Sequence, residues 1–125
     1  MNLNQITLPA CNIDESVSFY EALGLKKIVS NGAYARFECP QGHSTLSVEK
    51  VDRRTLSPSA VTYFEVDNLK GTVDSLEKKG IKFDSGPTDE EWLWSEARLT
   101  DPSGNVICIY SAGGNRKNPP WRLKS

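Results

Sequence analysis

The hydrophobic positions of the chain follow two patterns, short runs of the β type and two stretches with helical spacing. The helical stretches cover about 15–23 and about 68–79, and each is followed by a glycine, Gly24 or Gly80. The runs that predict strands or extended segments lie at 5–10, 25–30, 33–38, 44–51, 61–66, 81–84 and in both arms of a hairpin within 97–110. The order strand, helix, strand, strand, strand therefore occurs twice.

Polar residues at the ends of these runs predict where the elements begin and end. Asn12 or Asp14 is expected to cap the first helix, and Asp67 or Asn68 the second, because their side chains accept hydrogen bonds from free backbone N–H groups. The pair Gly86-Pro87 predicts a loop after the extended segment 81–84. In the hairpin, the sequence D-P-S-G-N favours a tight turn, with a glycine where positive φ is needed.

The two halves of the chain are also related residue by residue. The first part repeats at an offset of 80 − 24 = 56 and the hairpins repeat at 97 − 35 = 62. Matched pairs include Asn12 with Asn68, Val17 with Val73, Gly24 with Gly80, Ala35 with Ala97, Arg36 with Arg98 and Gly42 with Gly104. We therefore predict one domain, 1–112, made of two modules at about 3–51 and 60–112, with a linker at 52–59 and a C-terminal tail at 113–125.

Composition narrows the classes of partner and compartment. The 125 residues suit a single domain, and a formal net charge of −1 gives no electrostatic basis for binding nucleic acid or an anionic membrane. No apolar run approaches membrane-spanning length, and the first residues lack the pattern of a signal peptide. Three widely spaced cysteines, Cys11, Cys39 and Cys108, favour a reducing cytoplasm over a disulfide framework.

Three segments carry a resemblance to a known family. They are S-V-S-F-Y-E-A-L-G-L at 16–25, F-E-V-D-N-L at 64–69 and W-L-W-S-E-A-R-L-T-D-P-S-G-N at 92–105. With these segments the chain resembles the glyoxalase / bleomycin-resistance / extradiol dioxygenase group, the vicinal oxygen chelate superfamily, over about 3–112. The resemblance implies an α+β fold in which two tandem βαβββ modules form a cup-shaped, barrel-like curved mixed sheet with flanking helices. It also implies a cleft and, commonly, a homodimer.

Catalytic members of that family bind a divalent metal through His, Gln and Glu on the first and last strand of each module. The corresponding positions here are Gln5, Ser47 or Glu49, Val61 or Tyr63, and Cys108. Valine cannot bind a metal, and Cys108 in V-I-C-I-Y reads as a small buried residue. The single histidine, His43, lies in a predicted turn. We therefore predict no cofactor; if nickel, zinc, manganese or iron is bound, the expected ligands are Gln5 and Glu49.

Aromatic and basic residues provide further candidates for ligand contact. Trp92 and Trp94 alternate with Leu93, which predicts that both rings lie on one face of an extended segment. There they are either buried between sheets or form a wall on which a ligand stacks. Arg36 and Arg98 occupy matching positions and are either exposed strand residues or an anion-binding pair.

Three functions are compatible with these features. The first hypothesis is a metal-free cytoplasmic protein that binds a small organic molecule in its cleft. Its candidate contacts are Gln5, Ser47, Glu49, Tyr63, Trp92, Trp94, Arg98 and Cys108. The second is a metal-dependent lyase, isomerase or dioxygenase with a degenerate ligand set, and the third is a ligand-free scaffold or regulatory dimer. The tail, with Pro119, Pro120 and Trp121, is expected to dock on the domain or on a second subunit.

Overall fold

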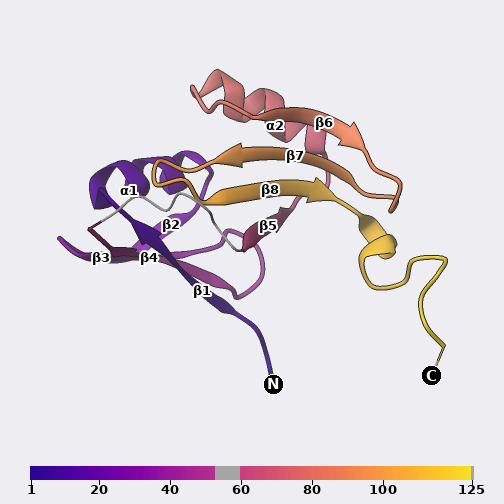
Figure 1. Cartoon of the computed structure of the whole chain (residues 1–125), viewed down its shortest axis with the longest axis horizontal. Coiled ribbons are helices and arrows are strands. Elements are labelled where there is room, and N and C mark those ends of the chain that lie inside the picture. Colours follow the sequence, from indigo (N-terminus) through magenta and orange to yellow (C-terminus); the bar gives the residue numbers. More distant parts are fainter. Residues whose placement is uncertain (53–59, 125) are drawn as a thin grey trace. The chain divides into compact units, whose positions relative to one another are not determined.

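Each half of the chain forms a four-stranded mixed sheet and one α-helix (Figure 1). The computed structural model describes residues 1–52 and 60–124. It confirms the predicted α+β class and the repeated order strand, helix, strand, strand, strand. The chain divides into two units, Met1–Ala60 with Thr100–Asn105, and Val61–Leu99 with Val106–Ser125.

The two sheets have the same topology. In the first half the elements are β1 Gln5–Ala10, α1 Ile13–Ala22, β2 Lys26–Asn31, β3 Tyr34–Glu38 and β4 Thr45–Lys50. In the second half they are β5 Val61–Glu65, α2 Leu69–Lys78, β6 Ser85–Asp89, β7 Ser95–Thr100, β8 Val106–Ser111 and the 3₁₀ helix η1 Gly113–Arg116. The strand orders are β1-β4-β3-β2 and β5-β8-β7-β6. The first and last strand of each module pair in parallel, β1 with β4 and β5 with β8.

The helices begin and end at the repeated polar signals. Of the predicted alternatives, Asn12 and Asn68 are the caps, because each Oδ1 accepts a hydrogen bond of 3.0 Å from the backbone N–H three residues later. A glycine with left-handed backbone follows each helix, Gly24 at φ 105° and Gly80 at φ 92°. These conformations explain why both modules place glycine there.

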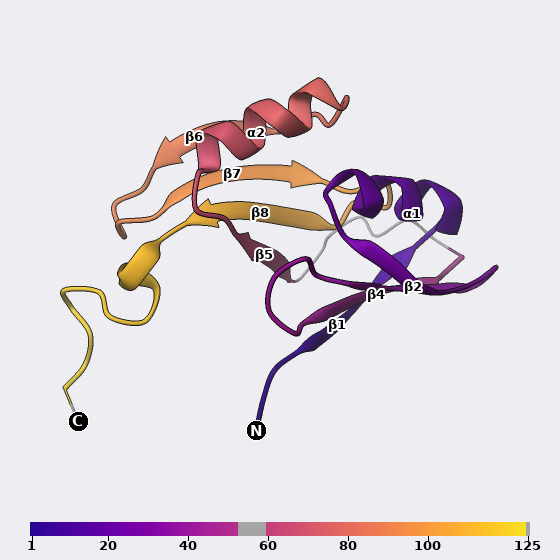
Figure 2. The ribbon, with the colours of Figure 1, turned by 180° about the vertical axis from the view of Figure 1, so that it is seen from behind.

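One face of each sheet is apolar and is covered by the helix of its own half, as Figures 1 and 2 show from opposite sides. The buried strand residues of the first sheet include Leu8, Ala35, Phe37, Leu46 and Val48. Those of the second sheet include Ala97, Leu99, Ile107 and Ile109, and α2 adds Leu69, Val73 and Leu76. Since strand side chains alternate between faces, the remaining strand positions point the other way. We call this second surface of each sheet its helix-free face.

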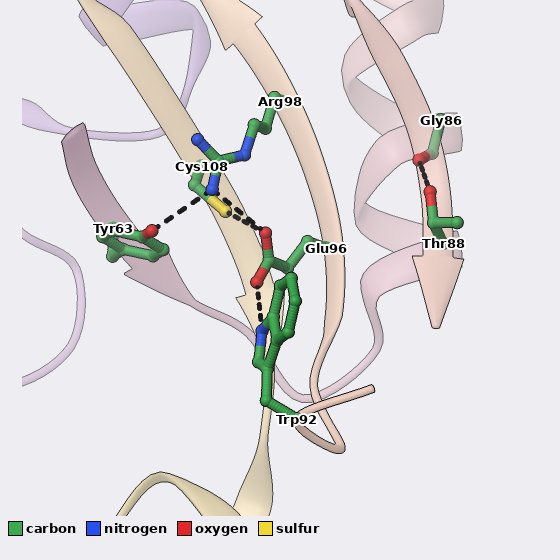
Figure 3. Close-up of polar contacts among 7 residues, drawn as sticks. All are labelled: Tyr63, Gly86, Thr88, Trp92, Glu96, Arg98 and Cys108. Carbon is green, nitrogen blue, oxygen red and sulfur yellow. Dashed lines mark hydrogen bonds and ion pairs between the residues drawn. The ribbon is translucent and has the colours of Figure 1, made fainter. Parts of the chain in front are cut away.

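One predicted element of the second module is wrong. The segment 81–84 contains no strand, and β6 instead includes the residues that were predicted to open a loop, Gly86 and Pro87. Proline is tolerated there because β6 is an edge strand, and its pairing with β7 shifts register between Ser85 and Thr88. Within β6, the Thr88 hydroxyl donates a hydrogen bond of 2.9 Å to the Gly86 carbonyl (Figure 3).

The turn between β7 and β8 is part of the first unit and is built around a buried carboxylate. Oδ1 of Asp101 accepts hydrogen bonds from the backbone N–H groups of Ser103 and Asn105, each at 2.9 Å. Its Oδ2 accepts from the Tyr20 hydroxyl at 2.6 Å and from Asn105 Nδ2 at 2.8 Å. Gly104 has φ 94°, which confirms the predicted turn glycine.

The two segments outside the modules are described only in part. The predicted linker, 52–59, lies outside the described residues from position 53 on. At the start of the tail, η1 is held near β5 by an ion pair of 3.8 Å between Arg116 Nε and Glu65 Oε1. Further along, Trp121 is 56% exposed. The docking of the tail therefore stays a prediction.

Candidate functional site

A buried carboxylate, Glu96, is the centre of a polar cluster on the helix-free face of the second sheet (Figure 3). Its residue is only 5% exposed. Trp92 Nε1 donates to Oε2 at 2.7 Å, and Arg98 Nη2 donates to Oε1 at 3.3 Å. The thiol of Cys108 donates to Oε1 at 3.6 Å, and Arg98 Nη2 also donates to the Tyr63 hydroxyl at 3.2 Å. These donors satisfy the carboxylate, as its burial requires.

Three aromatic rings lie beside this cluster. Trp94 stacks on Tyr110, with ring centroids 4.6 Å apart and an interplanar angle of 21°. Tyr63 meets both rings edge-on, at 6.1 Å from Trp94 and 5.6 Å from Tyr110. Tyr63 is 45% exposed, whereas Tyr110 is buried, so the cluster both packs inside the fold and presents aromatic surface to solvent. Such a surface beside a few polar groups is typical of small-molecule sites.

The predicted extended geometry of the tryptophan segment is wrong. Trp92 lies in the turn between β6 and β7, not in a strand. Leu93 has φ 66°, a left-handed conformation that breaks the alternation on which the prediction rested. The two indoles therefore have different roles: Trp92 binds the buried carboxylate of Glu96, and Trp94 stacks on Tyr110.

Burial and the glutamate control the chemistry of the cluster. Burial raises the pKa of the Cys108 thiol to about 12, and the Glu96 carboxylate adds to the rise. At neutral pH this cysteine is a neutral thiol and therefore a weak nucleophile. For Arg98, burial is the largest single effect and works against the charged form, but the interactions with Glu96, Cys108 and Tyr63 together outweigh it, so the pKa is raised.

A second polar network lies on the helix-free face of the first sheet. Gln5 Nε2 donates to Ser47 Oγ at 2.7 Å, and the Thr45 hydroxyl donates to Gln5 Oε1. Ser47 Oγ is 2.6 Å from the Tyr34 hydroxyl oxygen, to which Arg36 Nε donates at 2.9 Å. Three strands, β1, β4 and β3, thus contribute to one continuous set of hydrogen bonds.

This network changes the acidity of its tyrosine. The hydrogen bond with Ser47 lowers the pKa of the Tyr34 hydroxyl, and the Arg36 guanidinium acts in the same direction. Burial opposes the change, and so, more weakly, does the carboxylate of Glu49, which is the register partner of Tyr34. The pKa nevertheless lies below its ordinary value.

The predicted site residues fall into two groups, one on each sheet. The first group is Gln5, Ser47 and Glu49, and the second is Tyr63, Trp92, Trp94, Arg98 and Cys108. Gln5 and Ser47 are brought into contact. Glu49 is not joined to Gln5, because it pairs with Pro9, four residues further along β1, which is about 13 Å.

Three residues of these clusters, Glu96, Tyr34 and Tyr110, are not among the candidates predicted from the sequence. The repeat contains the signal that would have found the first two. Glu96 matches Tyr34 at 96 − 34 = 62, the offset that also relates Arg98 to Arg36. In both modules the arginine therefore has a hydrogen-bond acceptor two residues earlier on the same strand face.

Comparison with known proteins agrees with this fold. The sequence profile of the Glyoxalase/Bleomycin resistance protein/Dioxygenase superfamily matches residues 2–109. The chain belongs to this superfamily. A relative of the chain is the uncharacterized protein YraH of Bacillus subtilis (strain 168), which is 29% identical over 129 residues, covering 88% of this chain and 98% of that protein.

Two solved structures show the superfamily fold. A glyoxalase/bleomycin resistance protein/dioxygenase from Nocardioides matches with a TM-score of 0.80 and 19% identity, over 99% of this chain and 90% of that one. A bleomycin-binding protein in complex with bleomycin matches with a TM-score of 0.72 and 21% identity, over 89% and 98% of the two chains. Within residues 1–52 and 60–124, no helix is long and apolar enough to cross a membrane.

The residues at the superfamily's metal positions do not fit a divalent ion. Both ends of the Gln5 amide already bind neighbours, Ser47 and Thr45, and the buried Cys108 thiol donates to Glu96. Val61 has no donor atom on its side chain. In the part of the chain that the structure describes, no three His, Cys, Asp or Glu side chains come together as a metal-binding group.

Proposed function

We propose that this superfamily member binds a small organic molecule on the helix-free face of its second sheet and does so without a catalytic metal. The observation that carries the proposal is the aromatic cluster of Tyr63, Trp94 and Tyr110 beside the Glu96–Arg98 pair. Aromatic surface supplies most of the binding free energy in such sites, and a few fixed polar groups orient the ligand. A superfamily fold that holds bleomycin in another protein supports the same reading.

The arrangement favours a planar ligand that carries a hydrogen-bond acceptor. Tyr63 is 45% exposed, so its side chain offers aromatic surface for contact with a ligand ring. Its hydroxyl oxygen accepts from Arg98, which leaves its own O–H to donate to a ligand. Glu96 neutralises the charge of Arg98, so we expect a neutral ring system to bind this face better than an anion.

Ligand binding is tested with bleomycin and a library of aromatic fragments, by saturation-transfer NMR and tryptophan fluorescence. We expect saturable binding that weakens at least about fivefold in Trp94→Leu, because one aromatic contact contributes about 1–3 kcal/mol. Trp121→Leu is the matched control, since that indole lies in the tail and is largely exposed. Equal binding by both variants, or no binding of any probe, would overturn the proposal and leave the scaffold hypothesis in front.

The alternative function, a metal-dependent lyase, isomerase or dioxygenase, is tested separately. The protein is purified without chelators, incubated with nickel, zinc, manganese or iron, and its metal content is measured by mass spectrometry. We expect substoichiometric metal that does not change in Gln5→Ala or Glu49→Ala. Stoichiometric metal that either substitution removes would contradict the metal-free proposal.

We further propose a cytoplasmic homodimer in which the tail contributes to the interface. Trp121 and Leu123 are large exposed apolar residues close together in the tail, and such surface is often covered by a second subunit. Light scattering is expected to give a dimer for the full chain and a weaker one after removal of 113–125. A monomer at all concentrations would refute the dimer.

A further inference from the structure

The polar network of the first sheet is not used by the function proposed above. We propose that Tyr34 and Arg36 form a binding site for the carboxylate group of a small organic acid. Both side chains lie on the helix-free face of the first sheet, two residues apart on β3. The site shares no residue with the aromatic cluster on the second sheet.

The Gln5 amide determines which atom donates in the first hydrogen bonds of this network. Its Oε1 accepts from the Thr45 hydroxyl, which orients the amide so that Nε2 donates to Ser47 Oγ. Ser47 Oγ has one hydrogen of its own to donate, and its bond to the Tyr34 hydroxyl can have either polarity by distance alone. The burial of the serine decides between the two.

Ser47 is fully buried. If Tyr34 donated to it, the serine hydrogen would need another acceptor, and within the described residues the only hydroxyl partner placed to accept it is Tyr34 itself. A buried hydroxyl hydrogen without an acceptor carries a desolvation penalty. Ser47 therefore donates to Tyr34, whose oxygen then accepts two hydrogen bonds, from Ser47 and from Arg36 Nε. The hydrogen of the Tyr34 hydroxyl then points away from both donors and can be donated to a ligand.

Arg36 supplies the charge for an anion. Its counterpart Arg98 is neutralised by Glu96, but the residue that matches Glu96 in the first module is Tyr34, whose phenol form carries no charge. Arg36 is exposed, and it makes no ion pair among the described residues. With Nε bound to Tyr34, the two terminal nitrogens remain as a planar pair of donors, a geometry that matches a carboxylate.

Glu49 is the one described acidic residue that is in register with Tyr34 on the neighbouring strand β4. Its carboxylate acts against an anionic ligand at this site, as its effect on the pKa of Tyr34 indicates. The proposal therefore includes a test of sign: removal of this charge should strengthen carboxylate binding, whereas removal of Arg36 should weaken it.

The experiment is an NMR titration with sodium acetate against sodium chloride at constant ionic strength. Arginine Nε–Hε signals and tyrosine ¹³Cζ signals report Arg36 and Tyr34 directly. We expect saturable, millimolar acetate binding that weakens at least about tenfold in Arg36→Gln and about three- to tenfold in Tyr34→Phe, and that strengthens in Glu49→Gln. Lys27→Gln is the matched control, because it removes one positive charge from the same sheet. Lys27 is in register with the core residue Phe37 and therefore lies on the opposite face from Arg36.

Three outcomes would overturn the inference. They are signal changes that do not saturate, equal changes with chloride, or equal loss of binding in Lys27→Gln and Arg36→Gln. Tyr34→Phe keeps the ring and is expected to fold, so the test does not depend on the buried Ser47. Because the readouts lie on the first sheet, failure here leaves the fluorescence test of Trp94 on the second sheet unaffected.

Discussion

Substitution of Tyr20 by phenylalanine removes one hydroxyl from the interior of the first unit. Tyr20 is fully buried, and its hydroxyl donates at 2.6 Å to the buried carboxylate of Asp101. The carboxylate keeps three other donors, from Ser103 and Asn105. A hydrogen bond to a charged group contributes about 1.5–3 kcal/mol, so we expect Tyr20→Phe to lower the free energy of unfolding by about 2 kcal/mol at pH 7.

The same contact predicts how this difference depends on pH. Burial and the charge of Asp101 raise the pKa of Tyr20 far above its unfolded value of about 10. Its contribution is therefore fully present below pH 10. Above that pH the unfolded chain loses the proton and the folded chain keeps it, so the free energy of unfolding falls by about 1.4 kcal/mol per pH unit. Tyr20→Phe lacks this group, so the difference between wild type and variant should shrink above pH 10.

Urea denaturation followed by circular dichroism at pH 7, 9, 10 and 11 measures both effects. Tyr63→Phe is the control, because it removes a hydroxyl from an exposed tyrosine and is expected to cost less than about 0.5 kcal/mol. All other titrating groups are common to wild type and Tyr20→Phe and cancel in the difference. A loss below about 0.5 kcal/mol at pH 7, or a difference that stays constant from pH 9 to 11, would refute the reasoning.

Two further predictions concern buried polar atoms. Ser16 Oγ is buried and has no hydrogen-bond partner within the described residues. Ser16→Ala should therefore raise the free energy of unfolding by about 1 kcal/mol in the same urea assay. A loss of stability would contradict this expectation. The pKa of Cys108 is raised to about 12, so its contribution to stability is present below its unfolded value near 9 and is lost between about pH 9 and 12. Cys108→Ala should flatten that part of the stability curve, and in the native wild type this thiol should react with a disulfide reagent at pH 8 far more slowly than the partly exposed Cys11 and Cys39.

Most of the fold follows from local signals that occur twice. The capping asparagines, the glycines after the helices and the turn glycine Gly104 each require a particular backbone geometry, and all of them adopt it. The strand β6 was missed because glycine and proline are normally strand breakers, and only its edge position, a tertiary property, makes Pro87 acceptable.

Less of the candidate site could be predicted, because its contacts depend on distant segments. The resemblance to a family indicated Gln5 and Ser47 as candidate positions, and the two are in contact. It gave no indication that the Gln5 amide is hydrogen-bonded at both ends. From the sequence alone, Glu96 would be predicted to be a solvent-exposed strand residue. Its neighbours in the sequence do not indicate that the indole of Trp92, from the preceding turn, donates a hydrogen bond to it. The conformation of Leu93 that brings Trp92 into place is likewise unusual for a residue other than glycine.

The Tyr20–Asp101 contact also has a consequence for biosynthesis. The two residues are 81 positions apart, so α1 leaves the ribosome long before the turn that completes its environment. At roughly 5–20 residues per second, the nascent chain waits about 4–16 s for that carboxylate. During this interval the Tyr20 hydroxyl of α1 lacks the acceptor that it binds in the folded chain. The amino-terminal half is therefore expected to complete its folding only after most of the carboxy-terminal half has been translated, although the two halves are repeats of one module.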